Sequence, residues 1–386
     1  MDRNRKLGLL GSLYVAQGLP YGFFSQALPA LLRQLGLSLP AIGLTNLLAL
    51  PWMLKPIWAP LVDSFGTRKR WILGMQAASV ATVIGLAFVD PRASMAALLA
   101  GVLLTNLFAS TQDIATDGLA ISLLDRRERG LGNGIQVAGY RVGMILGGGL
   151  LLFVFERWGQ AVAFGVMAAL IAAASLPLLA TRALPAAARG GGKALDLLRA
   201  PGIVPWLAVP ATFKVGHYLA HGMLRPWMID RGYGLADVGW ILGIVGFTAG
   251  LLGALVGGWA TGRLGRRRSL VIFGLLEAAA LSGYVVADQL PSLYTLVSAA
   301  LVEHFVSGMG TAALFTCMMD VSRPTHAGTD YSFQSALVLV GSGLAATGSG
   351  LVAQALGHDG NFTLAVALTL TATAVAAWQG AWRAQE

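Results

Sequence analysis

Two aspartates lie four residues apart inside a long apolar stretch, Asp113 and Asp117 of the motif Q-D-I-A-T-D-G. Residues at this spacing share one face of an α-helix, so both carboxyl groups belong to the same face. The surrounding stretch is long enough to cross a bilayer. Ionisable groups in such a segment cost roughly 2.5–3.5 kcal/mol each on insertion scales, which makes them functional candidates. The chemistry they offer is proton uptake, ion pairing with a cation, or direct contact with a substrate.

Basic residues in other apolar stretches are candidate partners for these aspartates. Arg141 lies in the span that follows, and Lys55 lies between Pro51 and Pro56. Arginine keeps its proton in proteins, so Arg141 is a charge partner or an anion ligand and not a proton carrier. Lys55 has two interpretations. In one, its aliphatic chain carries the ammonium to the cytoplasmic surface, and in the other, Lys55 is part of a cytoplasmic gate. We expect an aspartate to pair with one of these cations or to take up and release a proton.

Polar and aromatic residues recur at helical spacing in further spans, and we interpret these faces as walls of a substrate cavity. They are Tyr14, Gln17, Tyr21 and Ser25 in the first span, Asn106 and Ser110 beside the aspartates, and Lys214, His217 and His221 in a later span. An amide such as Gln17 needs a polar neighbour in lipid, which favours the cavity. The alternative is packing, with Tyr21 in an interfacial aromatic belt.

The two histidines at His217 and His221 have two possible chemistries. Histidine titrates in the physiological range and could carry protons. Two histidines four apart can also bind a metal, but no third or fourth ligand is evident from the sequence, so no metal site is predicted. With Lys214 on the same face, a polar wall for an anionic ligand is the favoured interpretation.

Acidic residues gather where spans meet the cytoplasmic loops, among them Asp63, Asp320 and Asp330. One reading makes them helix caps and loop ion pairs. The other makes them a gate of ion pairs that closes the cytoplasmic face and can break. For the gate, we group Asp63 with Arg68 and Lys55.

The composition places the whole chain in a membrane. Of its 386 residues, 56% are hydrophobic and only 12% are charged, whereas a soluble domain has about 25% charged residues. A single cysteine, Cys317, excludes an intramolecular disulfide and a cysteine-based metal cluster. The basic N-terminus precedes an apolar stretch with no clear cleavage site, which we interpret as a retained span.

Apolar runs predict an all-α protein with twelve membrane spans. They cover residues 7–32, 39–62, 71–89, 95–124, 131–155, 160–181, 203–229, 236–259, 269–287, 291–320, 330–355 and 360–382. A basic linker rich in Gly, Pro and Ala, residues 182–202, separates a first half (1–181) from a second half (203–386).

Lysine and arginine predict the orientation, since they are enriched on the cytoplasmic side. Nineteen of the 27 lie at the termini, in the linker and in alternate loops, five lie in the opposite loops, and three lie within spans. Both termini are therefore expected in the cytoplasm. The net charge of +9 follows from this bias and needs no nucleic-acid partner.

The two halves resemble each other. Residues 28–43 align with 224–239, matching Gly36 with Gly232 and Gly43 with Gly239, and each half has a short basic loop one span later, D-S-F-G-T-R-K-R and T-G-R-L-G-R-R-R. Two parallel six-span repeats, and the form of these loops, resemble the major facilitator superfamily, whose substrates sit near the membrane midplane between the halves. Ala59 and Ser64 depart from the usual form of the first loop.

More specific segments resemble the AmpG-like permeases, and within them the RhtX/FptX-type siderophore permeases. They are Y-V-A-Q-G-L-P-Y-G-F-F-S-Q-A-L-P, L-P-W-M-L-K-P-I-W-A-P-L-V-D, Q-D-I-A-T-D-G, G-Y-R-V-G and L-R-P-W-M-I-D-R-G-Y. The siderophore branch rests mainly on the first segment. The third and fourth segments point to the wider family, which also includes muropeptide and acetyl-CoA transporters.

The resemblance implies a monomeric permease of the bacterial inner membrane that imports a ferric siderophore by alternating access. In the wider family such import is usually driven by protons. The alternative cargo is a muropeptide, acetyl-CoA or another bulky anion. Because spans one, four, seven and ten line the cavity in this superfamily, Glu303 is a second proton candidate. Glu277 lies in a peripheral span and is expected to make a structural hydrogen bond while protonated.

Other classes of function find little support in the residues. An enzyme would need a nucleophile with a base, or metal ligands, near one membrane face, and neither H-E-x-x-H nor G-x-S-x-G occurs. A sensor would be expected to carry a signalling domain, and a primary pump would need a Walker-type phosphate loop. No enzyme activity and no cofactor are expected.

Overall fold

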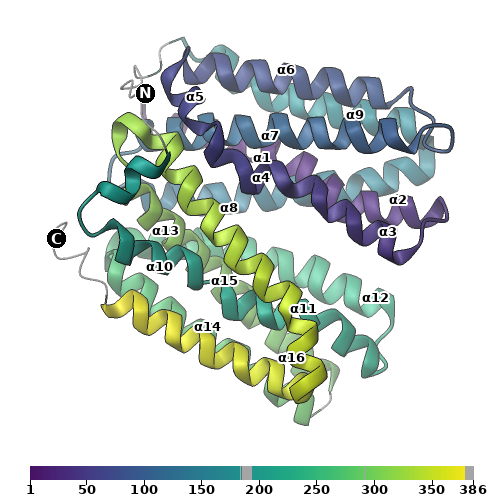
Figure 1. Ribbon diagram of the computed structural model, residues 1–386, viewed down its shortest axis with the longest axis vertical. Coiled ribbons are helices and arrows are strands. Elements are labelled where there is room, and N and C mark those ends of the chain that lie inside the picture. Colours follow the sequence, from purple (N-terminus) through teal and green to yellow (C-terminus); the bar gives the residue numbers. More distant parts are fainter. Residues whose placement is uncertain (183, 185–193, 291, 379–386) are drawn as a thin grey trace. The chain divides into compact units, whose positions relative to one another are not determined.

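The computed structural model describes residues 1–182, 184, 194–290 and 292–378, and the described chain is entirely helical (Figure 1). It divides into two compact units. Unit 1 comprises Met1–Asp125, Gly139–Ala194 and Ser322–Phe333, and unit 2 comprises Arg126–Ala138, Leu195–Val321 and Gln334–Glu386. Each unit therefore joins most of one half of the sequence to a short segment of the other half. The linker residues Arg189 and Lys193, and Arg383 near the C-terminus, lie outside the described residues.

The first half of the chain forms both long and interrupted helices. They are α1 (Arg3–Gly22), the π-helix η1 (Phe23–Ala27), α2 (Leu28–Gln34), α3 (Leu39–Leu44), η2 (Thr45–Ala49), α4 (Leu50–Leu54), η3 (Lys55–Ile57), α5 (Ala59–Ser64), α6 (Arg68–Leu86), α7 (Met95–Leu123), α8 (Arg129–Ile145), η4 (Leu146–Leu150) and α9 (Leu151–Ala180). Within unit 1, α6 lies side by side with α7 and α9 (Figure 1).

The second half follows the same plan. Its elements are η5 (Ala194–Arg199), α10 (Ile203–Thr212), α11 (Val215–Asp230), α12 (Leu235–Val238), η6 (Gly239–Gly246), α13 (Phe247–Leu264), α14 (Arg266–Gln289), α15 (Leu293–Val321), η7 (Pro324–His326) and α16 (Ala327–Trp378). In unit 2, α15 packs against both α13 and α14.

Six helical stretches of the described chain are long and apolar enough to cross a membrane. Two of them, residues 129–180 and 324–378, contain 52 and 55 residues, about twice the length of one crossing. Each contains a glycine with non-helical backbone, Gly159 or Gly357, and therefore holds two spans. The four other expected spans are residues 7–32, 39–62, 71–89 and 203–229. They correspond to the helices from α1 to α2, from α3 to α5, α6, and α10 with α11. The twelve-span, all-α architecture predicted from the sequence is confirmed, and its orientation across the membrane stays a prediction.

Glycines with positive φ record the duplication of the chain. Gly36 (φ +87°) ends α2 and Gly232 (φ +85°) ends α11, in a conformation that disfavours a Cβ atom. After each, the next N–H donates to the carbonyl five residues earlier, at 3.1 Å and 3.0 Å. Gly66 with Gly265 and Gly159 with Gly357 form two further pairs. The three pairs are separated by 196, 199 and 198 residues, so one repeat of about half the chain accounts for all of them.

Glycine also allows helices to touch through their backbones. A methyl group added at Gly18 of α1 would lie 2.1 Å from the carbonyl oxygen of Tyr140 in α8. In unit 2, a methyl group at Gly253 of α13 would lie 1.8 Å from the carbonyl oxygen of Phe305 in α15. Such close packing is the main source of helix association in lipid, where the hydrophobic effect between helices is weak.

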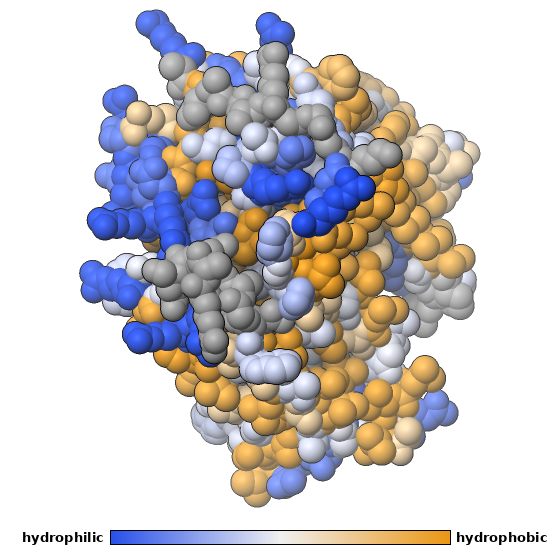
Figure 2. Space-filling view, turned by 60° about the vertical axis from the view of Figure 1, so that its left-hand side comes forward, coloured by the Kyte–Doolittle hydropathy of each residue, from blue (hydrophilic) through white to orange (hydrophobic). Residues whose placement is uncertain are grey.

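The surface of the protein suits lipid. Large hydrophobic side chains are exposed on both units, for example Ile57 (74%), Phe88 (84%) and Leu351 (72%). Figure 2 shows hydrophobic side chains over a wide area of one face, with hydrophilic side chains gathered in one part of it. A surface of this kind is normal for a protein whose outer helices face acyl chains.

Candidate functional site

A buried ion pair joins the second span to α7. Four prolines interrupt this span, and its short helix η3 begins at Lys55. The Lys55 ammonium donates to the Asp113 carboxylate, and the two residues are only 2% and 7% exposed. The ammonium therefore reaches a buried carboxylate and not the cytoplasmic surface, which contradicts the snorkelling interpretation. The structure pairs Lys55 with Asp113 and not with the Asp63 and Arg68 of the predicted gate group.

The helix α7 also provides hydrogen-bond partners for polar groups of the interrupted second span. Asn106 Nδ2 donates to the Leu48 carbonyl in η2 at 2.9 Å, and Trp58 Nε1 donates to Thr111 Oγ1 at 3.1 Å. Backbone groups freed by a broken helix need such partners at membrane depth. Asn106 therefore binds the backbone of the interrupted second span, in addition to its predicted place in the cavity wall. Ser110 is fully buried and donates to a carbonyl of its own helix at 3.0 Å.

Asp117 lies one turn beyond the ion pair and connects α7 to α1. Tyr14 Oη donates to Asp117 Oδ1 at 2.9 Å, and both residues are 1% exposed. Arg141 lies half-buried in α8. Its predicted pairing with an aspartate, and the predicted proton uptake by Asp113 or Asp117, stay predictions.

The rings of Tyr21, Trp52 and Tyr140 form an aromatic cluster. Of these residues, helical spacing in the sequence pointed only to Tyr21. Tyr21 lies 6.0 Å from Trp52 and 5.7 Å from Tyr140 between ring centroids, and Trp52 lies 6.4 Å from Tyr140. Trp52 Nε1 is buried and has no hydrogen-bond partner among the described residues. The motif L-P-W-M-L-K placed this tryptophan near Lys55, but only the break in the span brings its ring to Tyr21.

The predicted stripe on the first span divides at Tyr21. Gln17, one turn earlier, is fully buried, and neither atom of its amide has a partner in the described part of the chain. Ser25, one turn later, is exposed, and its hydroxyl donates to the Tyr21 carbonyl at 2.7 Å. The π-helix η1 (Phe23–Ala27) contains Ser25 and shifts the helical register after Tyr21.

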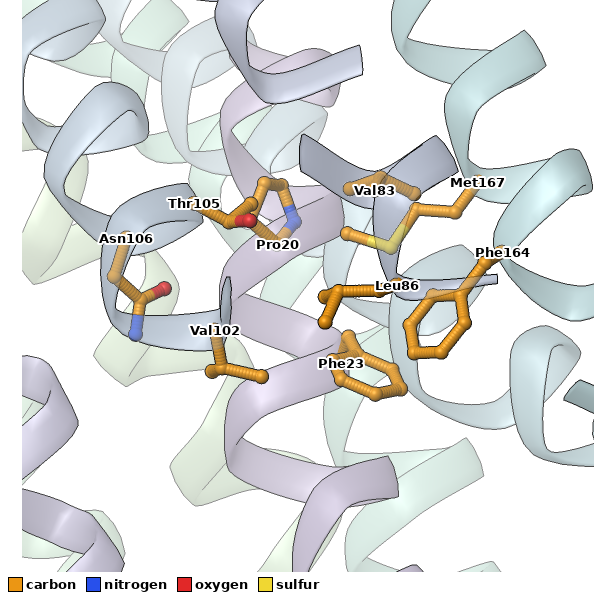
Figure 3. Close-up of a pocket in the computed structure, with 9 residues that line it drawn as sticks. All are labelled: Pro20, Phe23, Val83, Leu86, Val102, Thr105, Asn106, Phe164 and Met167. Atoms are coloured by element: carbon orange, nitrogen blue, oxygen red, sulfur yellow. The ribbon is translucent and has the colours of Figure 1, made fainter. Parts of the chain in front are cut away.

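A pocket within unit 1 lies close to this region and is shown in Figure 3. Its lining is mainly apolar, with Phe23, Phe164 and Met167 on one side and Thr105 and Asn106 at the other (Figure 3). Its cavity volume is about 10 Å³, far below the range of about 300–1,000 Å³ that drug-sized ligands occupy. We interpret it as a gap in the packing and not as the site of a bulky cargo.

Unit 2 contains a second buried charge network, at the point where the seventh span is interrupted. Lys214 lies between α10 and α11, and its Nζ donates to Glu277 Oε1 at 2.7 Å and to Ser307 Oγ at 2.8 Å. Glu277 is therefore the ion-pair partner of Lys214. The expected structural hydrogen bond of Glu277 is present, with the Lys214 ammonium as its donor. The expected protonated state of Glu277 stays a prediction.

Glu303 forms the centre of the same network. Its carboxylate oxygens lie 2.7 Å from His217 Nδ1 and 2.9 Å from His221 Nε2, and Tyr284 Oη donates to it at 3.3 Å. Glu303 is fully buried. His304 Nδ1 lies 2.9 Å from the Ala300 carbonyl oxygen and 3.0 Å from Glu303 Oε2. Sequence spacing showed which histidines share a face, but Tyr284 and Glu277 lie in another helix and gave no such signal. The predicted role of Glu303 in proton coupling stays a prediction.

Asp63 caps a helix that begins more than 260 residues later in the chain. Its Oδ2 accepts from the backbone N–H of Thr329 at 2.7 Å and from the Thr329 hydroxyl at 2.8 Å, near the start of α16. Arg68 lies 3.8 Å from the same carboxylate. Burial lowers the pKa of Arg68, and the charge of Asp63 opposes this effect. A carboxylate at a helix N-terminus is favourable, so the capping interpretation describes this contact.

Asp320 has the matching position in unit 2. Its carboxylate accepts from Arg129 Nη1 and from Arg266 Nε, each at 2.7 Å. Arg129 belongs to the segment that the first half contributes to unit 2. In both units, a buried aspartate at a span end thus holds a segment from the other half of the sequence. Whether these contacts act as a gate stays a prediction.

Comparison with known families decides the class. A family model described as "Major Facilitator Superfamily" matches residues 10–216 and again residues 213–381. The chain belongs to the major facilitator superfamily. The two matches correspond to the two repeats, and membership establishes a multi-pass membrane transporter.

Curated relatives within this superfamily are similar over most of the chain. The "Anhydromuropeptide permease" of Escherichia coli (strain K12) is 28% identical over 348 residues, covering 84% of this chain and 70% of the relative. The "Putative transporter AmpG 4" of Rickettsia conorii is 24% identical and covers 93% of both chains. These relatives support the predicted likeness to AmpG-like permeases. They give no support to the siderophore branch.

Solved structures of the superfamily share the fold. The Escherichia coli fucose:proton symporter FucP has a TM-score of 0.76 at 13% identity, covering 97% of this chain and 99% of that one. The human organic anion transporter MFSD10 also has a TM-score of 0.76, at 14% identity, covering 97% of this chain and 100% of that chain. At such identity the likeness concerns the fold alone.

Proposed function

We propose that this protein is an inner-membrane permease that imports an anhydromuropeptide-like cargo, an amino sugar linked to a short peptide with free carboxylates. The observation that carries the proposal is the similarity to the Escherichia coli permease over 84% of the chain. This is the alternative cargo of the sequence interpretation. Import of a ferric siderophore is the competing interpretation, which rests mainly on the first-span motif.

The aromatic cluster of unit 1 supports a cargo that contains a sugar. Aromatic faces pack well against the apolar faces of pyranose rings, and pockets of this kind add a few convergent polar groups. The rings of Tyr21, Trp52 and Tyr140 supply the faces. The buried Gln17 amide and the Trp52 N–H supply hydrogen-bonding groups that a sugar hydroxyl or an amide can satisfy.

Arg141 suits the charged end of such a cargo. It follows Tyr140 directly in α8 and is half-buried. A guanidinium binds a carboxylate through two parallel hydrogen bonds, which fixes both position and orientation. In this proposal, the rings hold the sugar while Arg141 binds a peptide carboxylate.

The buried network of α7 supports proton-driven transport by alternating access. Asp113 is tied to Lys55 and Asp117 to Tyr14, so each carboxyl group connects α7 to another span. Protonation of Asp117 would weaken its bond with Tyr14 and change the balance between outward and inward states. The Asp63–Thr329 and Asp320–Arg129 contacts then act as latches that must open for release to the cytoplasm.

The deciding experiment is uptake into proteoliposomes with an imposed pH gradient. The panel contains an anhydromuropeptide, acetyl-CoA, several ferric siderophores and their iron-free forms. Accumulation of the anhydromuropeptide, abolished by a protonophore, supports the proposal. Accumulation of one ferric siderophore instead refutes the cargo assignment and restores the competing reading.

The role of Asp117 needs a separate variant. Asp117→Asn should bind cargo and exchange it across the membrane without a gradient, but it should lose accumulation driven by protons. Full accumulation by this variant would exclude Asp117 as the coupling group, whichever cargo is transported.

A further inference from the structure

We propose that His217, His221 and Glu303 form a binding site for one divalent transition-metal ion of the Zn²⁺ type. The site lies within unit 2, and its three residues come from two helices, α11 and α15. One ligand atom from each residue lies within 4.8 Å of the others. The proposal is independent of the identity of the cargo.

The helix α11 presents the two histidines as a chelating pair. They are four residues apart on one face, and their ring centroids are 4.1 Å apart. Two histidines at this spacing on a helix are a recurrent zinc-binding arrangement. The third ligand, Glu303, comes from α15 and could not be identified from sequence because it lies more than 80 residues away.

The donor atoms already face each other. His217 Nδ1 and His221 Nε2 each point at a different oxygen of the Glu303 carboxylate, at 2.7 Å and 2.9 Å. Tetrahedral zinc with bonds of about 2.1 Å holds its ligand atoms roughly 3.3 Å apart. Binding an ion therefore requires these two contacts to widen by about 0.5 Å and all the ligand atoms, which lie within 4.8 Å of one another, to take up that spacing.

The surroundings orient the ligands and balance the charge. Tyr284 Oη donates to Glu303 Oε2 at 3.3 Å. Ser307 Oγ lies 3.2 Å from His217 Nδ1 and gives up this contact when Nδ1 binds the ion. Lys214, a cation of the same network, is paired with Glu277 at 2.7 Å. Outer hydrogen bonds of this kind hold metal ligands in place and tune their affinity.

The donor set selects the class of ion. Two imidazoles and one carboxylate suit Zn²⁺, Co²⁺ and Ni²⁺, whereas Mg²⁺ and Ca²⁺ prefer oxygen ligands throughout. Three protein ligands leave a fourth position for water or another donor. An ion held there would join α11 to α15 and stiffen unit 2.

The test measures metal binding to the full-length protein, purified in detergent and stripped of metal. Equilibrium dialysis with Zn²⁺ should give one ion per chain, and Co²⁺ should give the visible absorption of a four-coordinate site. The double variant His217→Ala/His221→Ala should bind at least about 100-fold more weakly. His358→Gln is the matched control, because His358 and Asp230 form a separate, partly exposed pair at 2.9 Å.

A second variant and a second measurement distinguish loss of the metal site from loss of folding. Glu303→Gln keeps the size and hydrogen-bonding capacity of the side chain, and it should also lose the ion. Zn²⁺ should raise the Tm of the wild type and of His358→Gln, but not of folded Glu303→Gln. Zn²⁺ binding that persists in both site variants, or is lost in His358→Gln, overturns the proposal, as does an absence of binding by the wild type.

Discussion

Removing one member of the buried pair Lys55–Asp113 should destabilise unit 1 strongly. The two side chains are only 3% and 10% exposed, so water cannot replace the lost partner. Breaking a buried pair from one side costs about 3–5 kcal/mol, because the remaining charge stays buried and unpaired. Lys55→Met and Asp113→Asn should each lose this amount. The double variant removes both charges and should recover most of it.

Thermal unfolding in detergent, followed by tryptophan fluorescence, measures the effect. Trp52 and Trp58 flank Lys55 in sequence and report on this part of unit 1. A domain of this size loses roughly 2–4 °C of Tm per kcal/mol. Each single variant should therefore unfold about 6–20 °C below the wild type, and the double variant much closer to it.

The control is a pair at the surface. Asp196→Asn removes the partner of Arg199, whose side chain is 86% exposed, and such pairs contribute little to stability. A wild-type Tm for Lys55→Met would refute the dependence of Asp113 on Lys55. A double variant as unstable as the single variants would show that the loss came from packing and not from an unpaired charge.

Three further variants test other parts of the structure. Gly18→Ala should prevent the close contact of α1 with α8 and lower the yield of folded protein, whereas Gly8→Ala on the same helix meets nothing within 4 Å and should behave as wild type in Tm and yield. Gly36→Ala and Gly232→Ala should lower Tm by similar amounts, since each forces a Cβ into positive φ at a cost of about 1–2 kcal/mol; a large effect at only one site would contradict the equivalence of the repeats. Trp52→Phe replaces the indole by a smaller aromatic ring and removes the unpaired N–H, so the KM for the cargo should rise severalfold in a protein that still folds. An unchanged KM would count against Trp52 as a cargo ligand.

The sequence was sufficient for features that depend on local pattern. Hydropathy gave the spans, and spacing placed Asp113 and Asp117 on one face of α7. The alignment that matched Gly36 with Gly232 is supported by their equal φ angles and identical helix ends. Each of these features is set by residues close together in the chain.

Features that depend on distant contacts could not be predicted. Lys55 was a candidate partner of the aspartates beside a surface and a gate interpretation, and only its contact with Asp113 in the structure selects the pairing. The pairing of Glu277 with Lys214 was not predicted, because Lys214 lies 63 residues away in another span. The aromatic partner of Tyr21 was missed for the same reason, since nothing in the sequence near Tyr21 indicates Trp52.

The exchange of segments between the halves has a consequence for biosynthesis. Unit 1 is incomplete until Ser322–Phe333 has been made, although its other parts end at Ala194. At about 5–20 residues per second, the ribosome needs about 7–28 s to translate that interval. During this delay the Asp63 carboxylate lacks the Thr329 groups that it later binds. Unit 1 therefore folds at first without the segment Ser322–Phe333, and it can be completed only after most of the second half has been translated.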